Sequence, residues 1–527
     1  LKKEANIDTN TLQNFLAKYD GYANDREINN KSLKQLKENF KDKIILVDEA
    51  SLISNRQMKN LLTIANKFNV RVILQGDKKQ LDSVEAGTPF QRLIDNNIIK
   101  YSELDNILRQ RDEIIKQAVY DTIKKDIKTS LDKLNKNNHI IELRTNEEIE
   151  RKEFNGGNYN EYLTQLENNN IDNVKRDLVN KTVEIYNNLS PNEKENTLII
   201  TSSNEIRKEI NSKIRESIKA ENNNTDNKTI NINTLELKSL TLQERKEIEN
   251  YKIDSSIIFT KDNTTINVKK NKEYNILEVD KNKKQIILEE INDNNIKDDN
   301  TKDNKITNKE NNKANNKINK TAIIVDVKKY ASIINEYTKE TKELITNDKI
   351  KFNITAKEIG IVKGDDFIIK DINRKEKTIT LIQTNNKTNN NGNGSNNNKQ
   401  KEITLNQNNP KENELIKHID YVYTTTTYSS QGKTSKNVIY TLESYRPILT
   451  NQKDFYVGLS RTKDNITIIT DNLNKSIKTL LANVGEQLGA KDIEMGNNVD
   501  NVSSITKVSD IEQQITIEKN KNIDMEL

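Results

Sequence analysis

Asp48 and Glu49 stand directly after a short apolar run, and this position predicts chemistry on a phosphate. The run "IILV" at 44–47 is predicted to be a β-strand. Ligands of open α/β sheets bind beyond the carboxyl ends of the strands. An aspartate there can hold the Mg²⁺ of a nucleoside triphosphate, and the adjacent glutamate can orient or deprotonate an attacking water. Taken alone, the pair also fits an ordinary strand that ends in two solvated acids.

A second apolar run, "VRVILQGD", ends in Gly76-Asp77, and Gln80 follows on the turn. A Gln or Asp at this place can contact a γ-phosphate. Loss of that contact after hydrolysis can then be transmitted to a bound strand. The alternative is a plain Gly-Asp turn with a capping aspartate. That alternative accounts for "GD" but not for the whole phrase "GDKKQLDSVEAGTPF".

Gly432, Lys433 and Thr434 look like the end of a phosphate-binding loop, G-x-x-x-x-G-K-[ST]. That pattern needs a second glycine five residues earlier, where this chain has Thr427. The stretch also lies far downstream of Asp48, whereas such a loop precedes the Asp-Glu strand. No complete phosphate-loop motif occurs in the 527 residues. The three residues therefore indicate a motif other than a phosphate-binding loop.

Composition narrows the classes of function. A net charge of +5 and a pI of about 8.7 permit nucleic acid as a partner without requiring it. The apolar share is 33%, with abundant Asn, Lys and Ile, which fits disorder or an AT-rich genome. The absence of cysteine excludes disulfides, iron–sulfur clusters and thiol nucleophiles. Two histidines leave no His/Cys metal cluster, so any metal is expected to be a hard cation such as Mg²⁺.

No run of apolar residues reaches membrane-spanning length and no signal peptide is visible, so we predict a cytoplasmic protein without a membrane partner. The chain begins with leucine rather than methionine, which suggests that upstream sequence is missing.

The elements around these residues read as α/β. Met58, Leu61, Leu62 and Ala65 recur at helical spacing between the two apolar runs, and strands alternating with helices predict a parallel sheet. Residues 105–189 are predicted to be mostly helical. A further strand is expected at 198–201, followed by a helix with one apolar stripe. The stripe consists of Ile206, Ile210, Ile214 and Ile218, after a predicted N-cap at Ser202, Ser203 or Asn204.

The pattern of the sequence changes at about residue 221, from alternating strands and helices to hairpins and polar tracts. "EYNILEVDKNKKQIILEE" and "DDFIIKDINRKEKTITLI" each predict a β-hairpin and resemble one another weakly. A small β-barrel-like insertion is therefore expected. Residues 292–320 and 384–401 are Asn-rich tracts to which no fold is assigned. The α/β pattern resumes at "YVYTTTT" and gives way to a polar tail after about residue 485.

Four phrases occur together in one order: "VDEAS", "ILQGDKKQLDSVEAGTPF", "SSQGKT" and "YVGLSRTKDNITIITD". In order and wording they resemble superfamily 1 DNA helicases of the RecD-like branch. The closest likeness is to the helicase half of conjugative relaxase-helicases of the TraA/TraI type. "EANIDTNTLQNFL", "ILRQRDE" and "TSSNEIRKEINSKIR" support the resemblance, which covers roughly residues 1–115, 195–220 and 415–475.

The resemblance implies an α/β fold with two RecA-like parallel-sheet domains and a small SH3-like β insertion. The first RecA-like domain, 1–105, would be incomplete at its N-terminal side. Residues 106–220 would form a helical connection and the start of the second domain, and 414–485 would complete that domain. The insertion would occupy 221–413, and 486–527 would be the polar tail.

The resemblance also implies roles in binding and hydrolysing ATP with Mg²⁺. Asp48 would coordinate the metal and Glu49 would be the catalytic base. Gln80 with Asp77 would contact the γ-phosphate, and Arg461 would be an arginine finger. Arg109 would be a second arginine that faces the phosphates; alternatively, it bridges to acids on a charged helix.

By the same resemblance, the segment 426–434 would contact single-stranded DNA without reading its sequence and would face the nucleotide cleft. Thr426, Ser430, Gln431 and Thr434 would bind the DNA backbone. Gly432 and Lys433 would face the nucleotide. Such binding is expected to weaken steeply with salt.

The family's own phosphate loop would precede "VDEAS". We therefore expect an upstream polypeptide that carries this loop and a relaxase domain, and little ATPase activity from this chain alone. Two alternatives remain open: a fragment of a RecD-type DNA repair helicase, and the non-catalytic, single-stranded-DNA-binding half of a split helicase.

Overall fold

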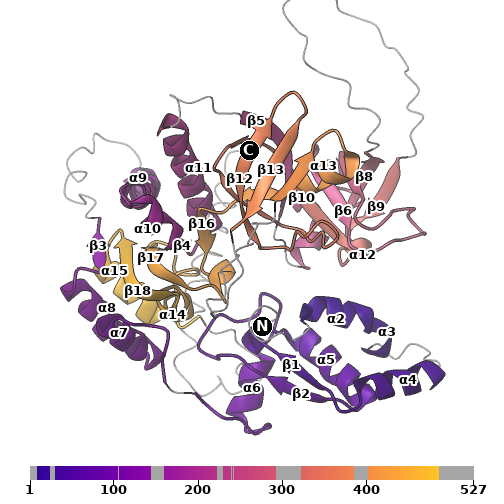
Figure 1. The fold of residues 1–527 in the computed structure, drawn as a ribbon, viewed down its shortest axis with the longest axis horizontal. Coiled ribbons are helices and arrows are strands. Elements are labelled where there is room, and N and C mark those ends of the chain that lie inside the picture. The colour runs from indigo at the N-terminus through magenta and orange to yellow at the C-terminus, as the bar shows by residue number, and fades with distance from the viewer. Residues whose placement is uncertain are drawn as a thin grey trace, which may run out of the picture. The chain divides into compact units, whose positions relative to one another are not determined.

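The computed structural model describes residues 9–23, 30–104, 106–143, 159–221, 229–238, 240, 242–291, 322–384 and 402–485. The chain divides into two compact units, one of residues 1–207 with 425–527 and one of residues 208–424. Figure 1 labels the elements of both units. Residues 292–320 and 385–401 of the polar tracts, and the tail 486–527, lie outside the described residues.

A two-stranded parallel sheet carries the Asp-Glu pair of the first unit. β1 (Ile44–Val47) pairs with β2 (Arg71–Leu74) in parallel, which confirms both predicted strands. The helices in this part of the chain are α2 (Leu12–Lys18), α3 (Asp20–Ala23), α4 (Asn30–Phe40), α5 (Asn55–Phe68) and α6 (Pro89–Asp95).

Helix α5 connects the two strands and begins at a capping box formed by Ser54 and Gln57. Its buried stripe is Met58, Leu61, Ile64, Ala65 and Phe68. Leu62, which the predicted stripe includes, is instead 43% exposed. At about 100° per residue, Leu62 lies off the centre of the stripe, where Ile64 and Phe68 take its place.

A five-stranded sheet forms the rest of the first unit, in the order β16–β4–β17–β18–β3 (Figure 1). The pairs β4–β17, β17–β18 and β18–β3 are parallel. The strands are β3 (Ile140–Glu142), β4 (Thr197–Thr201), β16 (Thr424–Thr426), β17 (Ser435–Leu442) and β18 (Thr462–Thr470). The helices are α7 (Glu113–Ile123), α8 (Ile127–Lys136), α9 (Tyr159–Asn187), α10 (Pro191–Glu195), α14 (Gln452–Ser460) and α15 (Leu473–Ala482).

Strand β3 departs from the prediction of a mostly helical stretch at 105–189. It has three residues, too few for an apolar period to be visible in the sequence. The helical prediction for α7, α8 and α9 is confirmed.

Helix α11 (Asn204–Glu221) follows β4 as predicted. The Ser203 hydroxyl accepts a hydrogen bond from the Ile206 N–H at 3.3 Å, so Ser203 is the N-cap. Ile206, Ile210 and Ile214 are fully buried. Ile218, at the end of the predicted stripe, is only half-buried.

The second unit contains two antiparallel sheets, in the orders β5–β10–β6–β7–β8–β9 and β14–β13–β12–β11–β15. The first uses β5 (Thr229–Leu237), β6 (Ser256–Phe259), β7 (Glu273–Asp280), β8 (Gln285–Glu290), β9 (Ile323–Asp326) and β10 (Ile334–Ile345). The second uses β11 (Lys349–Phe352), β12 (Asp366–Asn373), β13 (Thr378–Gln383), β14 (Glu402–Asn406) and β15 (Ile419–Tyr421). Two short helices, α12 (Val327–Tyr330) and α13 (Pro410–Ile416), complete it.

The two predicted hairpins are confirmed as β7–β8 and β12–β13. Each has a register irregularity at the same place in its first strand, between Ile276 and Glu278 and between Ile369 and Asp371. Each also lies in its own buried apolar cluster. The weak sequence repeat thus corresponds to two consecutive β modules, and the SH3-like character of the insertion stays a prediction.

Candidate nucleotide site

The loop after β1 holds the Asp-Glu pair in a constrained backbone. The Asp48 Oδ1 accepts a hydrogen bond from the Glu49 N–H at 3.0 Å. Glu49 lies in the left-handed region, with φ 51° and ψ 44°. A non-glycine residue there costs about 1–3 kcal/mol, and such residues cluster at functional sites. The geometry therefore agrees with a working role for Glu49.

Gly76 lets the end of β2 approach this loop closely. The Ala50 N–H donates to the Gln75 carbonyl at 2.8 Å. A Cβ at Gly76 would lie 3.0 Å from the Ala50 nitrogen and 3.1 Å from the Ser51 nitrogen. Because these are backbone atoms that cannot move aside easily, the position needs glycine. The close approach brings Asp77, which follows, towards Glu49.

The electrostatics of Glu49 identify its neighbours. Burial raises the pKa of Glu49 above its ordinary value, and the adjacent Asp48 raises it further, as does Asp77 to a lesser degree. The positive charges of Arg461 and Arg109 oppose this rise in pKa. Four other residues singled out in the sequence, Asp48, Asp77, Arg109 and Arg461, therefore act electrostatically on Glu49.

Arg461 ends helix α14 and is only 1% exposed. Its guanidinium donates to the Val457 carbonyl at 3.1 Å, to the Ser460 hydroxyl at 2.9 Å and to the Lys433 carbonyl at 3.4 Å. Burial first, and then the charge of Arg109, lowers the pKa of Arg461 to about 10. Arg461 is therefore still charged at neutral pH, in surroundings that favour an incoming anion.

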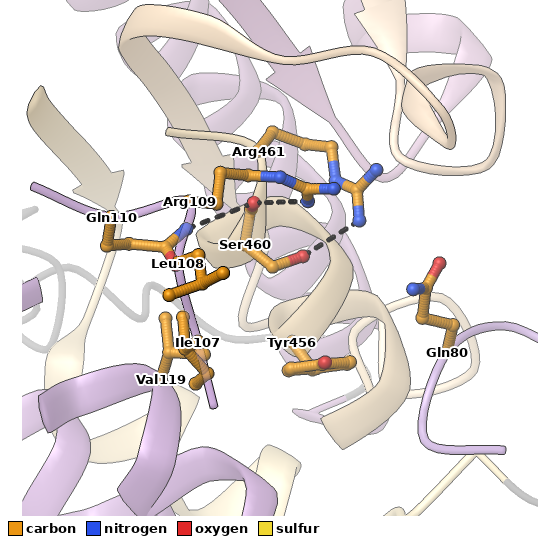
Figure 2. A pocket seen from close by; sticks show the side chains of 9 residues that line it. All are labelled: Gln80, Ile107, Leu108, Arg109, Gln110, Val119, Tyr456, Ser460 and Arg461. Carbon is orange, nitrogen blue, oxygen red and sulfur yellow. Dashed lines mark hydrogen bonds between the residues drawn. The ribbon is translucent and has the colours of Figure 1, made fainter. Parts of the chain in front are cut away.

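Arg109 lies beside Arg461 because both are tied to the end of α14. The Arg109 Nη1 donates to the Ser460 carbonyl at 2.8 Å. The Gln110 Nε2 donates to the Ser460 carbonyl at 3.2 Å and to the Thr462 carbonyl at 2.9 Å. Figure 2 shows the contacts of Arg109 and Gln110 with Ser460. Arg109 thus contacts a backbone carbonyl at the site.

A pocket of about 300 Å³ opens next to the two arginines (Figure 2). The Gln80 side chain lines it, and its Nε2 lies 3.4 Å from the Asp77 Oδ2. The Gln80 Oε1 is buried and has no hydrogen-bond partner among the described residues. The lining consists of Gln80, Ile107, Leu108, Arg109, Gln110, Val119, Tyr456, Ser460 and Arg461.

The donors at this site suit a magnesium–nucleotide complex better than a dedicated metal cage. Among the described residues, no group of three or more His, Asp and Glu side chains could hold a metal ion. Mg²⁺ bound with a nucleotide needs only one or two carboxylates, because phosphates and waters fill its other positions. The exposed carboxylate of Asp48 at a strand end fits that mode.

The segment after β16 forms a compact turn held by its own hydroxyls. The Thr426 Oγ1 donates to the Ser429 Oγ at 3.1 Å, and the fully buried Ser430 Oγ donates to the Thr427 carbonyl at 2.7 Å. Gly432 has φ +75°, which a glycine adopts readily. Gly432 and Thr434 are exposed.

Lys433 connects this turn with the candidate nucleotide site, whereas the nearby Gln431 amide is unpartnered among the described residues. The Lys433 carbonyl accepts the hydrogen bond from Arg461. Both polar atoms of the Gln431 amide are buried and have no partner within the described part of the chain. Of the four residues predicted to bind DNA, Thr434 is thus presented at the surface, and the hydroxyls of Thr426 and Ser430 are engaged within the turn.

Sequence reasoning missed several residues of α14. Lys453 forms a buried ion pair with Asp82, and the Tyr456 hydroxyl donates to the Asp77 Oδ2 at 2.7 Å. Asp454, buried on another side of the helix, accepts from the Ser202 Oγ at 2.6 Å and the Tyr440 OH at 2.7 Å. The spacing of Lys453 and Tyr456, one helical turn apart, is a signal only if the helix is already known to face the site.

Asp454 predicts an unusual pH dependence of stability. Burial raises its pKa from 3.8 to about 6. The folded state therefore binds this proton more strongly than the unfolded state, and stability falls as the pH rises through that interval, by about 2–3 kcal/mol. We expect the urea midpoint of Asp454→Asn to change less with pH than that of the parent chain, between about pH 4 and about pH 7. The partly exposed Asp464→Asn is the control; equal slopes in both variants would refute the prediction.

Comparisons with known proteins agree with these motifs. Residues 1–145 match the family described as AAA domain, and residues 367–470 match the viral superfamily 1 RNA helicase core domain. The multifunctional conjugation protein TraI of Escherichia coli K12 is 21% identical over 487 residues, which are 89% of this chain and 24% of TraI. The conjugal transfer protein TraA of Agrobacterium fabrum is 28% identical over 142 residues, 27% of this chain and 12% of TraA.

These matches support a likeness of this chain to a superfamily 1 helicase region of the TraA/TraI type. The chain spans about a quarter or less of the length of these relatives. Among solved structures, one chain from a structure of DNA unwinding at forked double-stranded DNA by two coordinating Pif1 helicases aligns over 91% of this chain and 78% of its own length, with 11% identity and a TM-score of 0.38. Pif1 from Candida albicans aligns over 93% and 82%, with 12% identity and a TM-score of 0.34. Such TM-scores do not establish a common arrangement of the whole chain.

In the described part of this chain, no helix combines the length and the apolar character needed to cross a membrane.

Proposed function

We propose that this chain is the helicase portion of a conjugative relaxase-helicase, which uses ATP hydrolysis to translocate on DNA and unwind it. One observation carries the proposal: Gln80, Arg109 and Arg461 line one pocket, and the charges of both arginines act on Glu49, which stands at the end of a parallel strand. Paired carboxylates facing paired arginines suit the hydrolysis of a phosphoanhydride. The order of the helicase phrases along the chain supports the same function.

Each side chain has a proposed role. Asp48 would hold Mg²⁺, which neutralises charge on the phosphates when bound. Glu49 would take a proton from the attacking water. Gln80 and Asp77 would contact the γ-phosphate, with the unpartnered Gln80 Oε1 able to accept a hydrogen bond from that water. Arg461 and Arg109 would stabilise the charge that develops on the transferred phosphoryl group. Gly432 and Lys433 would face the nucleotide.

The segment 426–434 is proposed to bind the backbone of single-stranded DNA. Thr434 lies at the surface, and the unpartnered Gln431 Nε2 could donate to phosphate oxygens. Thr426 and Ser430 would set the shape of the turn, and they would donate to phosphate by turning their hydroxyls away from their present partners in the turn. The bond from Arg461 to the Lys433 carbonyl provides a direct connection to the nucleotide site.

A polypeptide segment that carries a phosphate loop is proposed to complete the site. The sheet of β1 and β2 presents three large apolar side chains to solvent: Ile44 at 53%, Leu46 at 44% and Ile73 at 44% exposure. Parallel sheets are normally covered on both faces. We call this chain together with such a segment the completed helicase. For a chain with this role in processing DNA, we propose a cytoplasmic location.

DNA binding by the purified 527-residue chain tests the proposal without hydrolysis. We expect labelled single strands of different sequence to bind with similar Kd. The affinity should fall with salt with a log–log slope of about −0.7 for each phosphate contacted. Fluorescence anisotropy measures both. Gln431→Ala should weaken binding, whereas Gln117→Ala, an exposed glutamine on α7, should not. A sequence-dependent or salt-insensitive Kd would argue against the proposal.

A further inference from the structure

Helix α14 contacts the segment 75–88 through two side chains one turn apart. The Lys453 Nζ lies 2.7 Å from both carboxylate oxygens of Asp82, and the two side chains are only 6% and 8% exposed. The Tyr456 hydroxyl donates to the Asp77 Oδ2 at 2.7 Å. We call these two contacts the α14 latch. They join a helix of the five-stranded sheet to the loop that follows β2.

The segment 75–88 depends on such contacts because it contains no helix or strand. Its far end is fixed to the start of α5, where the Asn55 N–H donates to the Ala86 carbonyl at 3.2 Å and the Ser54 Oγ donates to Glu85 at 3.0 Å. The two contacts of the latch fix the segment at Asp77 and at Asp82. Gln80 lies between these two fixed points, so its backbone position is defined by the latch.

The latch bears directly on Gln80. The Asp77 carboxylate that accepts from Tyr456 also accepts from the Lys79 N–H at 2.9 Å and lies 3.4 Å from the Gln80 Nε2. The same helix ends at Arg461, which lines the same pocket as Gln80 (Figure 2). One rigid element therefore sets both the polar amide and the guanidinium of the site.

A buried ion pair is a poor way to gain stability, because removing two charges from water costs about as much as their attraction returns. Its geometry is specific, however: Lys453 and Asp82 fit only one relative position of helix and loop. This favours a role in fixing that position over a role in general stabilisation.

We propose that Lys453 and Tyr456 are positioning residues, which hold Asp82 and Asp77 so that Gln80 stands at the correct distance from Arg461 for hydrolysis. This rests on the proposed function of the site. The proposal that the latch fixes the loop can be tested separately, because the position of the loop can be measured with no nucleotide bound.

Because the chain has no cysteine, two labels can be placed without background. Spin labels at Val84→Cys in the loop and Leu481→Cys on α15, at positions 70% and 50% exposed, report the loop position relative to the α14 side of the unit. We expect one narrow distance distribution in the parent chain. Lys453→Asp and Asp82→Lys should each broaden it about twofold, and the double exchange should restore it.

Arg56→Glu is the matched control, because it breaks an exposed pair with Glu85 at the far end of the same loop. It should leave the distribution unchanged. Unchanged distributions in the two single variants, or a double exchange that fails to restore the narrow distribution, would overturn the proposal. Failure of hydrolysis in the parent protein would count against the proposed function and would not alter these distances.

Tyr456→Phe separates positioning from general stabilisation in the completed helicase. The substitution removes only the hydroxyl that holds Asp77. We expect kcat for ATP to fall about ten- to a hundredfold with little change in KM, because misplacement of a catalytic group affects the chemical step. An unchanged kcat, or an equal loss through KM alone, would contradict the positioning role of Tyr456.

Discussion

Arg461→Ala is expected to lower kcat for ATP hydrolysis by the completed helicase about 10³- to 10⁵-fold, the range for an arginine that stabilises phosphoryl transfer. The reason lies in its surroundings. The guanidinium is almost fully buried, its neighbours include Arg109, and its pKa is lowered to about 10, so it keeps its charge while being poorly solvated. A charge in such a place interacts strongly with charge that develops nearby.

Steady-state ATP hydrolysis measures this loss of kcat. Three comparisons test whether the loss is specific to the Arg461 guanidinium. Arg461→Lys keeps a charge but not the planar fork, so it should recover only a small part of the rate. Arg111→Ala removes a largely exposed arginine that pairs with Asp464, and it should retain the parental rate. Nucleotide affinity in Arg461→Ala should change far less than kcat. A rate within tenfold of the parent, about 1.4 kcal/mol, would exclude the arginine-finger role.

Glu49→Gln should have the second largest effect, a loss of about 10²- to 10⁴-fold in kcat, because the amide cannot accept the proton of the attacking water. Gln keeps the size of the side chain, so folding and nucleotide binding should be retained. Glu85→Gln, which changes an exposed glutamate of the following loop, is the control. Full activity of Glu49→Gln would show that another group is the base.

The environment of Glu49 also sets the expected pH profile. Burial and Asp48 raise its pKa above 4.5, and a base must be unprotonated to act. Activity should therefore fall as the pH drops through this raised pKa, and the acid limb of the kcat profile should lie above 4.5. Asp48→Asn would remove one of the three causes of the rise in pKa and should move that limb to lower pH.

Local pattern was enough to predict the strands, the helices beside them and the two hairpins. The apolar runs before Asp48 and before Gly76 became β1 and β2, and the serine-rich turn before Ile206 became a helix cap. Short elements such as β3 escaped, because three residues have no measurable period. The exposure of Leu62 shows that helical spacing gives the stripe but not its edges.

The meeting of Glu49 with Arg109 and Arg461 could be expected only from the family resemblance, because these residues lie far apart in the sequence. The partners of α14 could not be expected at all. Lys453 and Asp82 look like ordinary surface charges in the sequence, and only the packing of helix and loop buries them together. Likewise, the turn after β16 uses its hydroxyls locally, which the letters "TTTTYSSQGKT" do not reveal.

The central claim is that Glu49, Arg461 and their neighbours form the hydrolytic half of a helicase site. This site needs a phosphate loop from outside the 527 residues. The most direct measurement is ATP hydrolysis stimulated by single-stranded DNA, with the chain alone and with a loop-bearing segment from the source gene or from a TraA relative. We expect negligible turnover from the chain alone, and turnover in the completed helicase that Glu49→Gln abolishes. Robust, DNA-stimulated turnover by the chain alone, lost in Glu49→Gln, would contradict the account.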